Sequence, residues 1–314
     1  MPAACNNPAP PADGVLVVDK PAGMTSHDVV VWARRLLGVA RIGHTGTLDP
    51  LATGVLPLVV GRATRLATLL AGGTKTYKAI IRLGTETDTY DAAGTPLPAP
   101  PGADTRARCL DRETVAAACR RFTGVFRQQP PAFSAKKVGG VRAYRLARRQ
   151  RQVDLPPVEV TVHEFEVIAL TDGCLHCRVS CSPGFYMRTL AHDLGQALGC
   201  GGCLEQLRRE RSGAFTLDDA VGLEAGADGA LPLHERLIAL DALLPELPAV
   251  VVTPHGAQRA SHGNLLRPAD IAAGAGRRTE GGAGDVRVCD DAGSLLAIAT
   301  PAAAGALHPR IVLV

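Results

Sequence analysis

The chain has 314 residues and a formal net charge of +4, with 46% hydrophobic and 20% charged residues. This length favours about two domains with a substantial core, and no apolar run approaches the about 18 residues that a membrane helix needs. These numbers argue against a membrane protein and against a highly charged disordered chain. Residues 1–13 lack a basic and apolar leader, so we expect a disordered tail on a cytoplasmic protein.

In chain order, the first half of the sequence predicts strands and helices separated by glycine-containing turns. A helix is expected to start at Thr25 or Ser26, which can cap it, and to stop at Gly38. The other predicted elements are a strand at 14–19, a turn at 20–23, a polar glycine loop at 41–53, a strand at 55–60, a short helix ending at Gly72, and a strand at 75–83.

The second half continues with a similar irregular alternation. The predicted elements are an exposed connection at 92–105, a helix capped by Asp111 and running to about Phe122, paired strands at 158–169 and 175–182, and a helix beginning near Tyr186. Prolines between 245 and 254 suggest a hinge into a small β module, with strands near 250–252, 286–288, 295–298 and 311–314. This order predicts an α+β fold with a mixed or antiparallel sheet.

The nine cysteines are expected to be reduced thiols, because no export signal is recognisable. Cys174 with Cys177, and Cys200 with Cys203, have a spacing that is close to that of zinc sites. Cys174 and Cys177 fall at a predicted strand, where residues three apart point to opposite faces. Cys200 and Cys203 are expected to flank a helix start as buried apolar residues. We therefore expect no metal, with a zinc-dependent nucleic-acid protein as a competing interpretation.

A basic segment from Arg120 to Arg151 contains ten Lys and Arg and no acidic residue, which leaves 24 basic and 30 acidic residues elsewhere. Phe122, Phe126, Phe133 and Tyr144 interleave with the positive charges. This composition suits phosphate contacts and base stacking. A solvated helix surface is the alternative, but such helices normally carry acidic partners at four-residue spacing. The candidate RNA-binding residues are Lys136, Lys137, Arg142, Arg145 and Arg149.

The loop from Gly43 to Gly54 contains one carboxylate, Asp49, and one imidazole, His44. Pro50 restricts Asp49 to extended conformations, and the glycines allow another chain to approach closely. The Gly-x-x-x-x-Gly-Lys pattern of a phosphate-binding loop is absent. Taken alone, Asp49 could equally cap a turn and His44 could anchor the loop.

Several motifs in collinear order decide between these interpretations. The loop 43–54 resembles the signature of the TruB-type pseudouridine synthases, and so do Asp19-Lys20-Pro21, Lys75-Thr76-Tyr77, the segment 87–91 and the segment 184–189. The resemblance implies the pseudouridine synthase fold over residues 14–247, with residues 120–151 as a basic RNA-gripping insertion. It also implies a PUA-like RNA-binding module over residues 248–314, although that part matches only weakly.

The resemblance implies three catalytic residues and no cofactor. Asp49 is similar to the essential aspartate that acts at the ribose, Tyr77 to the tyrosine that stacks on the target uracil, and Arg188 to the arginine that pairs with the carboxylate. A nearby guanidinium favours the ionised carboxylate and fixes its orientation. Substrate contacts are implied for His44, Tyr186 and Leu207, with Lys20 and Asp91 as further candidates. Lys136 departs from the family pattern, which commonly has an apolar residue there.

The expected activity is isomerisation of uridine 55 in the T arm of tRNA by a monomer. Flipping the base out of its stack costs a few kcal/mol, so contacts to the extruded nucleotide are part of catalysis. Two alternatives remain open. One is a guide-dependent synthase that acts on ribosomal RNA, and the other is a tRNA-folding chaperone whose chemistry is incidental.

Overall fold

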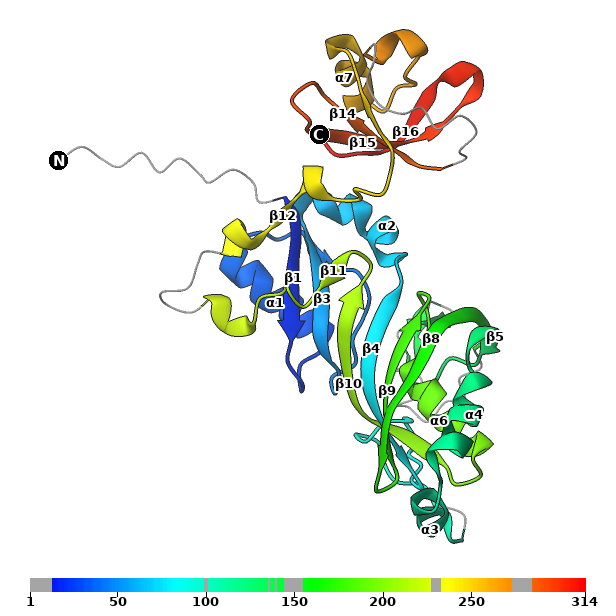
Figure 1. Ribbon diagram of the computed structural model, residues 1–314. Helices are drawn as coiled ribbons and strands as arrows, with labels where there is room; N and C mark the ends of the chain where they lie inside the picture. Colours follow the sequence, from blue (N-terminus) through cyan, green and yellow to red (C-terminus); the bar gives the residue numbers. More distant parts are fainter. Residues whose placement is uncertain are drawn as a thin grey trace, which may run out of the picture.

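The structure is a computed structural model that describes residues 13–98, 101–134, 136–138, 140–143, 155–226, 233–272 and 284–314. A long twisted sheet forms the main body, and a smaller sheet lies beyond one end of it (Figure 1). Residues 1–12 of the expected tail lie outside the described residues. Asp13 is anchored, because its carboxylate accepts hydrogen bonds from the backbone N and the Nε of Arg62, both at 2.6 Å.

The large sheet has ten strands in the order β12-β1-β3-β10-β4-β9-β8-β5, with β2 paired to β3 and β11 to β10. Its strands are β1 Gly14–Lys20, β2 Ile42–His44, β3 Thr53–Val60, β4 Lys75–Leu83, β5 Gly124–Gln128, β8 Val158–Thr171, β9 Cys174–Cys181, β10 Gly202–Ser212, β11 Phe215–Thr216 and β12 Ile238–Ala239. Among the described strands of this sheet, β3 and β10 are the parallel pair and the other neighbours are antiparallel. The predicted mixed, largely antiparallel sheet is confirmed.

Helices α1, α4 and α6 cover one face of this sheet. The described helices are α1 Ser26–Leu37, α2 Ala67–Ala71, α3 Ala103–Arg108, α4 Arg112–Arg120, α6 Met187–Ala197 and α7 Pro254–Ser261, and the 3-10 turns are η1 Gly61–Leu66, η2 Leu223–Gly226, η3 Leu233–Arg236, η4 Leu240–Ala242, η5 Pro268–Asp270 and η6 Ala303–Gly305. Thr25 caps α1 by accepting from the backbone N of Asp28, and Gly38 ends it at φ 65°, as predicted. No helix in the described ranges is long and apolar enough to cross a membrane.

Alternate residues of β1 and β3 enter two different hydrophobic clusters. Leu16 and Leu56 pack with Leu190 of α6 in the main core. On the opposite face, Val15 packs in a cluster that also contains Ile298 of the C-terminal sheet. The two sheets are therefore joined by a shared apolar contact, in addition to the chain that connects them.

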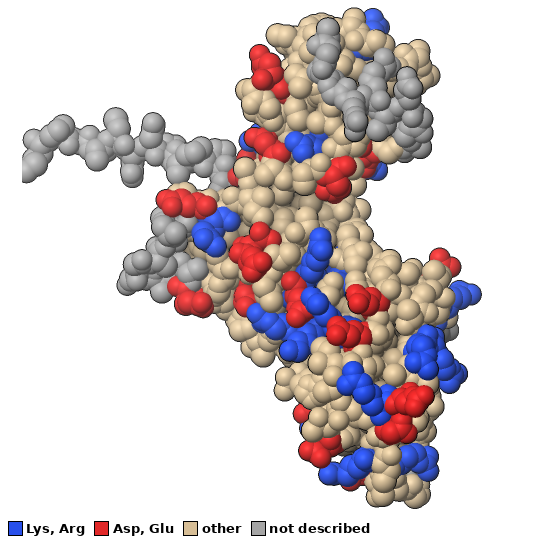
Figure 2. Space-filling view, in the orientation of Figure 1, with Lys and Arg blue, Asp and Glu red and all other residues tan. Residues whose placement is uncertain are grey.

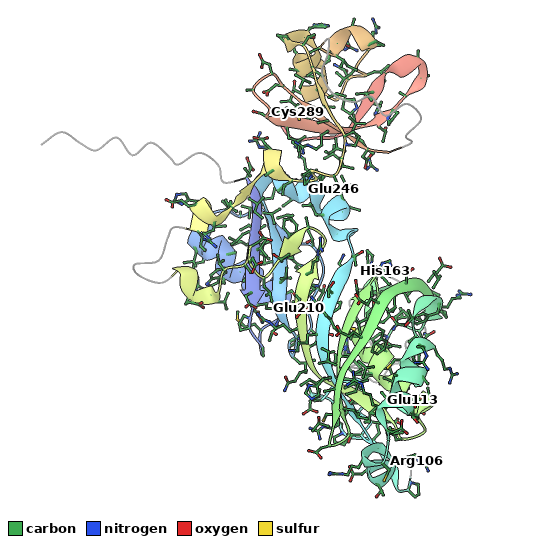
Figure 3. The ribbon with its side chains drawn as sticks, in the orientation of Figure 1. Arg106, Glu113, His163, Glu210, Glu246 and Cys289 are labelled. Atoms are coloured by element: carbon green, nitrogen blue, oxygen red, sulfur yellow. The ribbon has the colours of Figure 1, made fainter. Side chains whose placement is uncertain are left out.

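The C-terminal sheet has the order β13-β14-β15-β16. Its strands are β13 Ala249–Val251, β14 Val286–Cys289, β15 Leu295–Pro301 and β16 Leu307–Val312. Figure 3 shows Cys289 within this module and Glu246 at the junction with the main body. The strands predicted near 250–252, 286–288 and 295–298 are confirmed as β13, β14 and β15, whereas β16 begins at Leu307, four residues before the predicted 311–314. Helix α7, which Thr253 caps through its hydroxyl, was not predicted.

Three further sequence-based expectations differ from the structure. The connection 92–105 ends in α3, and the loop 41–53 contains the short strand β2. Cys203 lies in β10 and not at a helix start, because Gly201 takes a φ of 75° and turns the chain into the sheet. Charged residues stand at buried as well as exposed positions of β10, which hid its alternation from a prediction based on hydrophobicity.

The face of the sheet opposite helix α6 carries charges of both signs over β10, β4 and β9 (Figure 2). Three ion pairs cross it: Arg178–Glu210 at 2.8 Å, Arg82–Glu205 at 2.5 Å and Arg208–Asp19 at 2.7 Å. This balanced surface lacks the one-sided positive charge that an RNA backbone favours.

Candidate active site

Asp49 lies in the loop between β2 and β3, and this loop is tied to α1. The backbone N of Leu48 donates to Ser26 Oγ at 2.8 Å, and Ser26 Oγ donates to the carbonyl of Leu48 at 3.0 Å. The side chain of Asp49 is 35% exposed. A fixed loop therefore presents a carboxylate that solvent and substrate can reach.

Arg188, in the first turn of α6, forms an ion pair with Asp49. Its Nε donates to Asp49 Oδ2 at 2.8 Å and its Nη2 to Asp49 Oδ1 at 3.3 Å. The same guanidinium donates to the carbonyl of Thr89 at 3.1 Å and to that of Phe133 at 2.7 Å. Arg188 is 6% exposed, so four contacts fix its position and it in turn orients the carboxylate.

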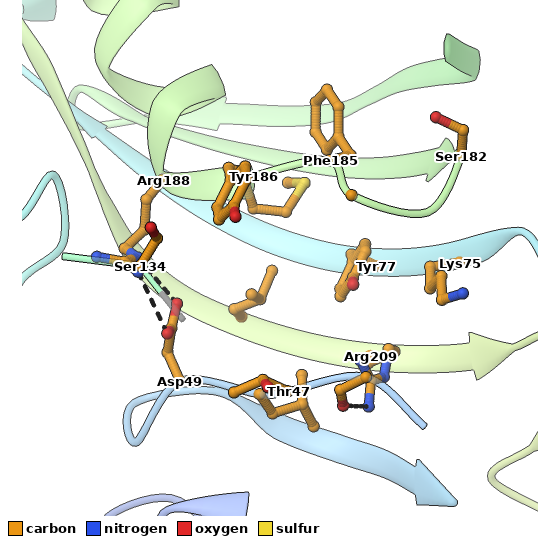
Figure 4. A pocket seen from close by; sticks show the side chains of 15 residues that line it. Thr47, Asp49, Lys75, Tyr77, Ser134, Ser182, Phe185, Tyr186, Arg188 and Arg209 are labelled. Carbon is orange, nitrogen blue, oxygen red and sulfur yellow. Dashed lines mark hydrogen bonds and ion pairs between the residues drawn. The ribbon is translucent and has the colours of Figure 1, made fainter. Parts of the chain in front are cut away.

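Asp49 and Arg188 stand at one side of a cavity of about 240 Å³ (Figure 4). The cavity is lined by Gly46, Thr47, Leu48, Asp49, Lys75, Tyr77, Ser134, Ser182, Gly184, Phe185, Tyr186, Met187, Arg188, Leu207 and Arg209. Tyr77 and Leu207 come from the neighbouring strands β4 and β10, and Phe185 and Tyr186 come from the segment before α6. Five sequence candidates, Asp49, Tyr77, Arg188, Tyr186 and Leu207, thus converge on one cavity.

Burial keeps the two tyrosines of the cavity in their neutral form. It raises the pKa of Tyr77 above its ordinary value, against an opposing effect of the Arg209 guanidinium. Burial also raises the pKa of Tyr186. Both phenols therefore provide a hydroxyl group and an aromatic face at neutral pH.

Gln128, at the end of β5, clamps the backbone of Tyr186. Its Nε2 donates to the carbonyl of Tyr186 at 3.0 Å, and its Oε1 accepts from the backbone N of Tyr186 at 2.8 Å. Gln128 is buried. This pair of hydrogen bonds sets the position from which the Tyr186 side chain enters the cavity.

Three of the other sequence candidates do not line the cavity. His44 lies at the end of β2, paired with Leu58. Lys20 is buried beneath the Asp49 loop and donates to the carbonyls of Pro21 at 2.8 Å and Met24 at 2.7 Å. Asp91 accepts from Thr89 Oγ1 at 2.8 Å, and its Oδ2 lies 3.7 Å from Arg188 Nε.

Lys20 and Asp91 lie outside the cavity but contact Pro50 and Arg188, and their expected contacts with the substrate stay a prediction. Lys20 also donates to the carbonyl of Pro50 at 3.4 Å, which connects it to the residue after Asp49. Burial lowers the pKa of Lys20 to about 8, against an opposing effect of Asp49. Asp91 adds a second carboxylate next to Arg188.

Lys75, Arg209 and Gln128 were not among the sequence candidates. Lys75 and Arg209 line the cavity, and both are buried. Lys75 had a signal, since it begins the motif that contains Tyr77. Arg209 had none, because the sequence Leu207-Arg208-Arg209 does not show which arginine points inward.

The basic segment is described only in part. Backbone pairing joins Lys137 to Arg142 in the hairpin of β6 Lys137–Val138 and β7 Val141–Arg142, and the carbonyl of Lys136 accepts from the backbone N of Ala143 at 2.7 Å. The side chains of Lys137 and Arg142 and all of Arg145 and Arg149 lie outside the described residues. Their expected role in RNA binding stays a prediction.

The cysteine pairs do not assemble into a metal site in the described part of the chain. Cys177 is buried and Cys174, on the other face of β9, has its Sγ 3.6 Å from Glu205 Oε2. Within the described ranges, no group of three or more His, Cys, Asp or Glu is placed to hold a metal ion. Opposite faces of one strand keep Cys174 and Cys177 apart, as the spacing predicted.

Comparison with solved structures identifies the fold. The chain superimposes with a TM-score of 0.71 on a chain of an H/ACA RNP bound to a substrate RNA containing 2'-deoxyuridine, at 23% identity over 96% of this chain and 86% of that chain. A chain of a Cbf5-Nop10-Gar1 complex gives a TM-score of 0.71 at 24% identity, over 96% of this chain and 85% of that chain. The pseudouridine synthase fold is thereby confirmed.

Comparison with sequences identifies the family. Residues 34–187 match the model of the TruB family pseudouridylate synthase N-terminal domain, and residues 188–247 match that of the tRNA pseudouridylate synthase B C-terminal domain. The tRNA pseudouridine synthase B of Solibacter usitatus is 42% identical over 305 residues, which is 96% of this chain and 100% of the relative. That of Thermobifida fusca is 47% identical, with 82% of this chain and 87% of the relative covered. The chain belongs to the TruB family of pseudouridylate synthases.

Proposed function

We propose that the protein converts uridine 55 in the T arm of tRNA to pseudouridine, with Asp49 as the catalytic carboxylate and without a cofactor. The observation that carries this proposal is the bidentate contact of Arg188 with Asp49 at the side of an aromatic cavity. A tRNA substrate is supported by the curated relatives, which are named tRNA pseudouridine synthase B.

The reaction begins when the target uridine leaves its stack and enters the cavity. Asp49 then acts on the ribose, and the bond between N1 and C1′ breaks. The uracil turns so that its C5 bonds to C1′, the hydrogen at C5 leaves as a proton, and N1 takes up a proton, which gives an isomer of uridine. Arg188 aims the oxygens of Asp49, because both are contacted by the guanidinium.

The walls of the cavity suit a flat pyrimidine. Tyr77 offers an aromatic face and Leu207 an apolar one, while Tyr186 closes the side near α6. Stacking on an aromatic ring is worth about 1–3 kcal/mol per base, which offsets much of the cost of flipping. We assign substrate positioning to these three residues, with His44 as a contact to the RNA outside the cavity.

We further propose a division of labour along the chain. Residues 14–247 carry catalysis, residues 120–151 grip the tRNA backbone, and residues 248–314 form an RNA-binding module of PUA type that acts in a monomer. The absence of acidic residues between Arg120 and Arg151 supports the gripping role. Neutralising Arg142, Arg145 and Arg149 together should weaken tRNA binding and flatten its salt dependence, and unchanged affinity would dismiss that role.

A tritium-release assay tests the activity directly. Purified protein is incubated with a tRNA transcript that carries tritium at uridine C5, in chelator and without any cofactor. Isomerisation at one site releases one equivalent of tritium, and replacing uridine 55 by cytidine should remove it. Asp49→Asn should release none, because the amide cannot serve as the carboxylate. Full activity of Asp49→Asn would refute the assignment.

The same assay separates the two alternatives. A guide-dependent enzyme would release no tritium from tRNA without a guide RNA. The identity of 42–47% to the curated relatives, against 23–24% to the H/ACA and Cbf5 chains, favours action without a guide. A tRNA-folding chaperone would refold tRNA but leave its tritium in place.

A further inference from the structure

Lys75 and Arg209 line the side of the cavity that lies away from Asp49 (Figure 4). We call this buried pair of cations the positive floor of the cavity. Lys75 is 6% exposed and Arg209 is 1% exposed. Lys75 Nζ donates to the carbonyl of Gly73 at 2.5 Å and to that of Ala71. Arg209 Nε donates to the carbonyl of Val55 at 2.7 Å.

The two cations donate hydrogen bonds to the protein, but no carboxylate pairs with them in the described residues. Arg209 Nη2 donates to the carbonyl of Gly46 at 3.1 Å, so backbone carbonyls hold the guanidinium, as they hold the ammonium group of Lys75. Among the ion pairs of the described residues, none joins a carboxylate to Lys75 or to Arg209. A carbonyl satisfies an N–H group without cancelling its charge.

A purely structural role does not explain two neighbouring cations. Burial, with a smaller effect of Arg209, lowers the pKa of Lys75 to about 8, so the charge on Lys75 is disfavoured by its surroundings. A neutral side chain could donate hydrogen bonds to the same carbonyls, and its burial would cost less free energy than the burial of a charged group. The excess positive charge therefore suits an anion that enters from outside.

The shape of the cavity indicates which anion fits. Tyr77 and Leu207 line it along with Lys75, and the Arg209 guanidinium is close enough to Tyr77 to act on the pKa of its hydroxyl. A flat ring that lies against Tyr77 and Leu207, with its ribose at Asp49, directs its far edge towards the positive floor. Lys75 retains one N–H for that edge, because an ammonium group has three donors and two are engaged.

We propose, building on the function proposed above, that Lys75 and Arg209 stabilise the negative charge of the uracil after its bond to the ribose breaks. When the N1–C1′ bond breaks, its electron pair stays on the uracil and spreads to O2 and O4. Asp49 meets the electron-deficient ribose carbon at the other end. Lys75 acts on the ring directly, and Arg209 acts as a positioning residue through Tyr77.

The central test compares Lys75→Met with Lys78→Met by single-turnover tritium release and by tRNA affinity. Lys78 lies on the same strand but is exposed, so its variant is the matched control. Lys75→Met should slow release about 100-fold, the scale seen when one electrostatic donor is removed from an active site, while affinity changes less than about threefold. Lys78→Met should retain the wild-type rate.

A pH profile gives a readout that a structural role would not produce. Tyr77, Cys181 and Arg209 face Lys75 from β4, β9 and β10; burial raises the pKa of Tyr77 and raises that of Cys181 to about 12. The wild-type rate should fall above about pH 8 as Lys75 loses its proton. The rate of Lys75→Arg should be at least about tenfold above that of Lys75→Met and should not fall above pH 8. Lys20 also titrates near pH 8, but it does not line the cavity, so its titration is not expected to change the rate.

Several outcomes would overturn the proposal. They are a Lys75→Met rate within about threefold of wild type, a Lys75→Arg rate no better than that of Lys75→Met, and an alkaline fall that persists in Lys75→Arg. Unfolding midpoints check that each variant is folded, and Lys75→Gln replaces the methionine variant if that one does not fold. If Asp49→Asn is inactive while Lys75→Met is fully active, only this inference fails; if Asp49→Asn is active, the proposed function fails.

Discussion

Arg188 Nε donates to Asp49 Oδ2 at 2.8 Å, although the two residues are 139 positions apart in the chain. Arg188 lies in the first turn of helix α6, and Asp49 lies in the loop before β3. Because the guanidinium also holds the carbonyls of Thr89 and Phe133, four separate segments meet at this ion pair. The catalytic proposal can therefore be tested at Arg188 as well as at Asp49.

Arg188→Lys should lower the single-turnover rate about 100-fold, with tRNA affinity within about threefold of wild type. A lysine keeps the charge but cannot contact both carboxylate oxygens and two carbonyls in a fixed plane. Arg178→Lys is the control, since Arg178 is 53% exposed on β9 and pairs with Glu210. A rate for Arg188→Lys within threefold of wild type would contradict the orienting role.

Gln128→Ala should lower the free energy of unfolding by about 2–3 kcal/mol, measured by urea denaturation. The change leaves the backbone N and carbonyl of Tyr186 without their buried partner. The rate of tritium release should fall with it, because Tyr186 enters the cavity from this segment. Gln206→Ala, on an exposed position of β10, should stay within about 0.5 kcal/mol. Equal stability of the two variants would refute the clamp.

Gly54→Ala should destabilise the protein by about 3 kcal/mol or more. Gly54 has a φ of 100°, and a Cβ there would lie 2.2 Å from the carbonyl oxygen of Arg209. Gly23→Ala is the control, because Gly23 has a φ of 85° but no atom within 4 Å of the added carbon. That variant should lose only the about 1–2 kcal/mol of a left-handed residue. Similar losses for both would show that close packing at Gly54 contributes nothing.

Lys20→Met tests the linkage between a buried amine and pH. Burial lowers the pKa of Lys20 from 10.5 to about 8, so between these values the unfolded chain binds more protons than the folded one. The contribution of Lys20 to stability therefore rises with pH through this window, by at most about 1.4 kcal/mol per pH unit. In urea denaturation at several pH values, the free energy of unfolding of wild type should rise relative to that of Lys20→Met from pH 8 to 10. A constant difference would dismiss the shift.

Local patterns in the sequence predicted most elements of the fold. The cap at Thr25, the stop at Gly38 and the turn between β8 and β9 depend on neighbouring residues, so each is readable from a short window. Strand β10 was missed because it alternates between buried and charged residues in the centre of a sheet. Its burial depends on β3 and β4, which lie far away in the sequence.

The sequence by itself determined the family motifs, and with them Asp49, Tyr77 and Arg188 as candidates. Only the tertiary structure decided that Lys20 and Asp91 lie outside the cavity, next to Pro50 and Arg188, and that Lys75 and Arg209 form its floor. The physical reason is that a motif specifies which residue types are present at a spacing. The direction and burial of a charged side chain depend on the strands and loops that surround it, and these come together only when the whole sheet forms.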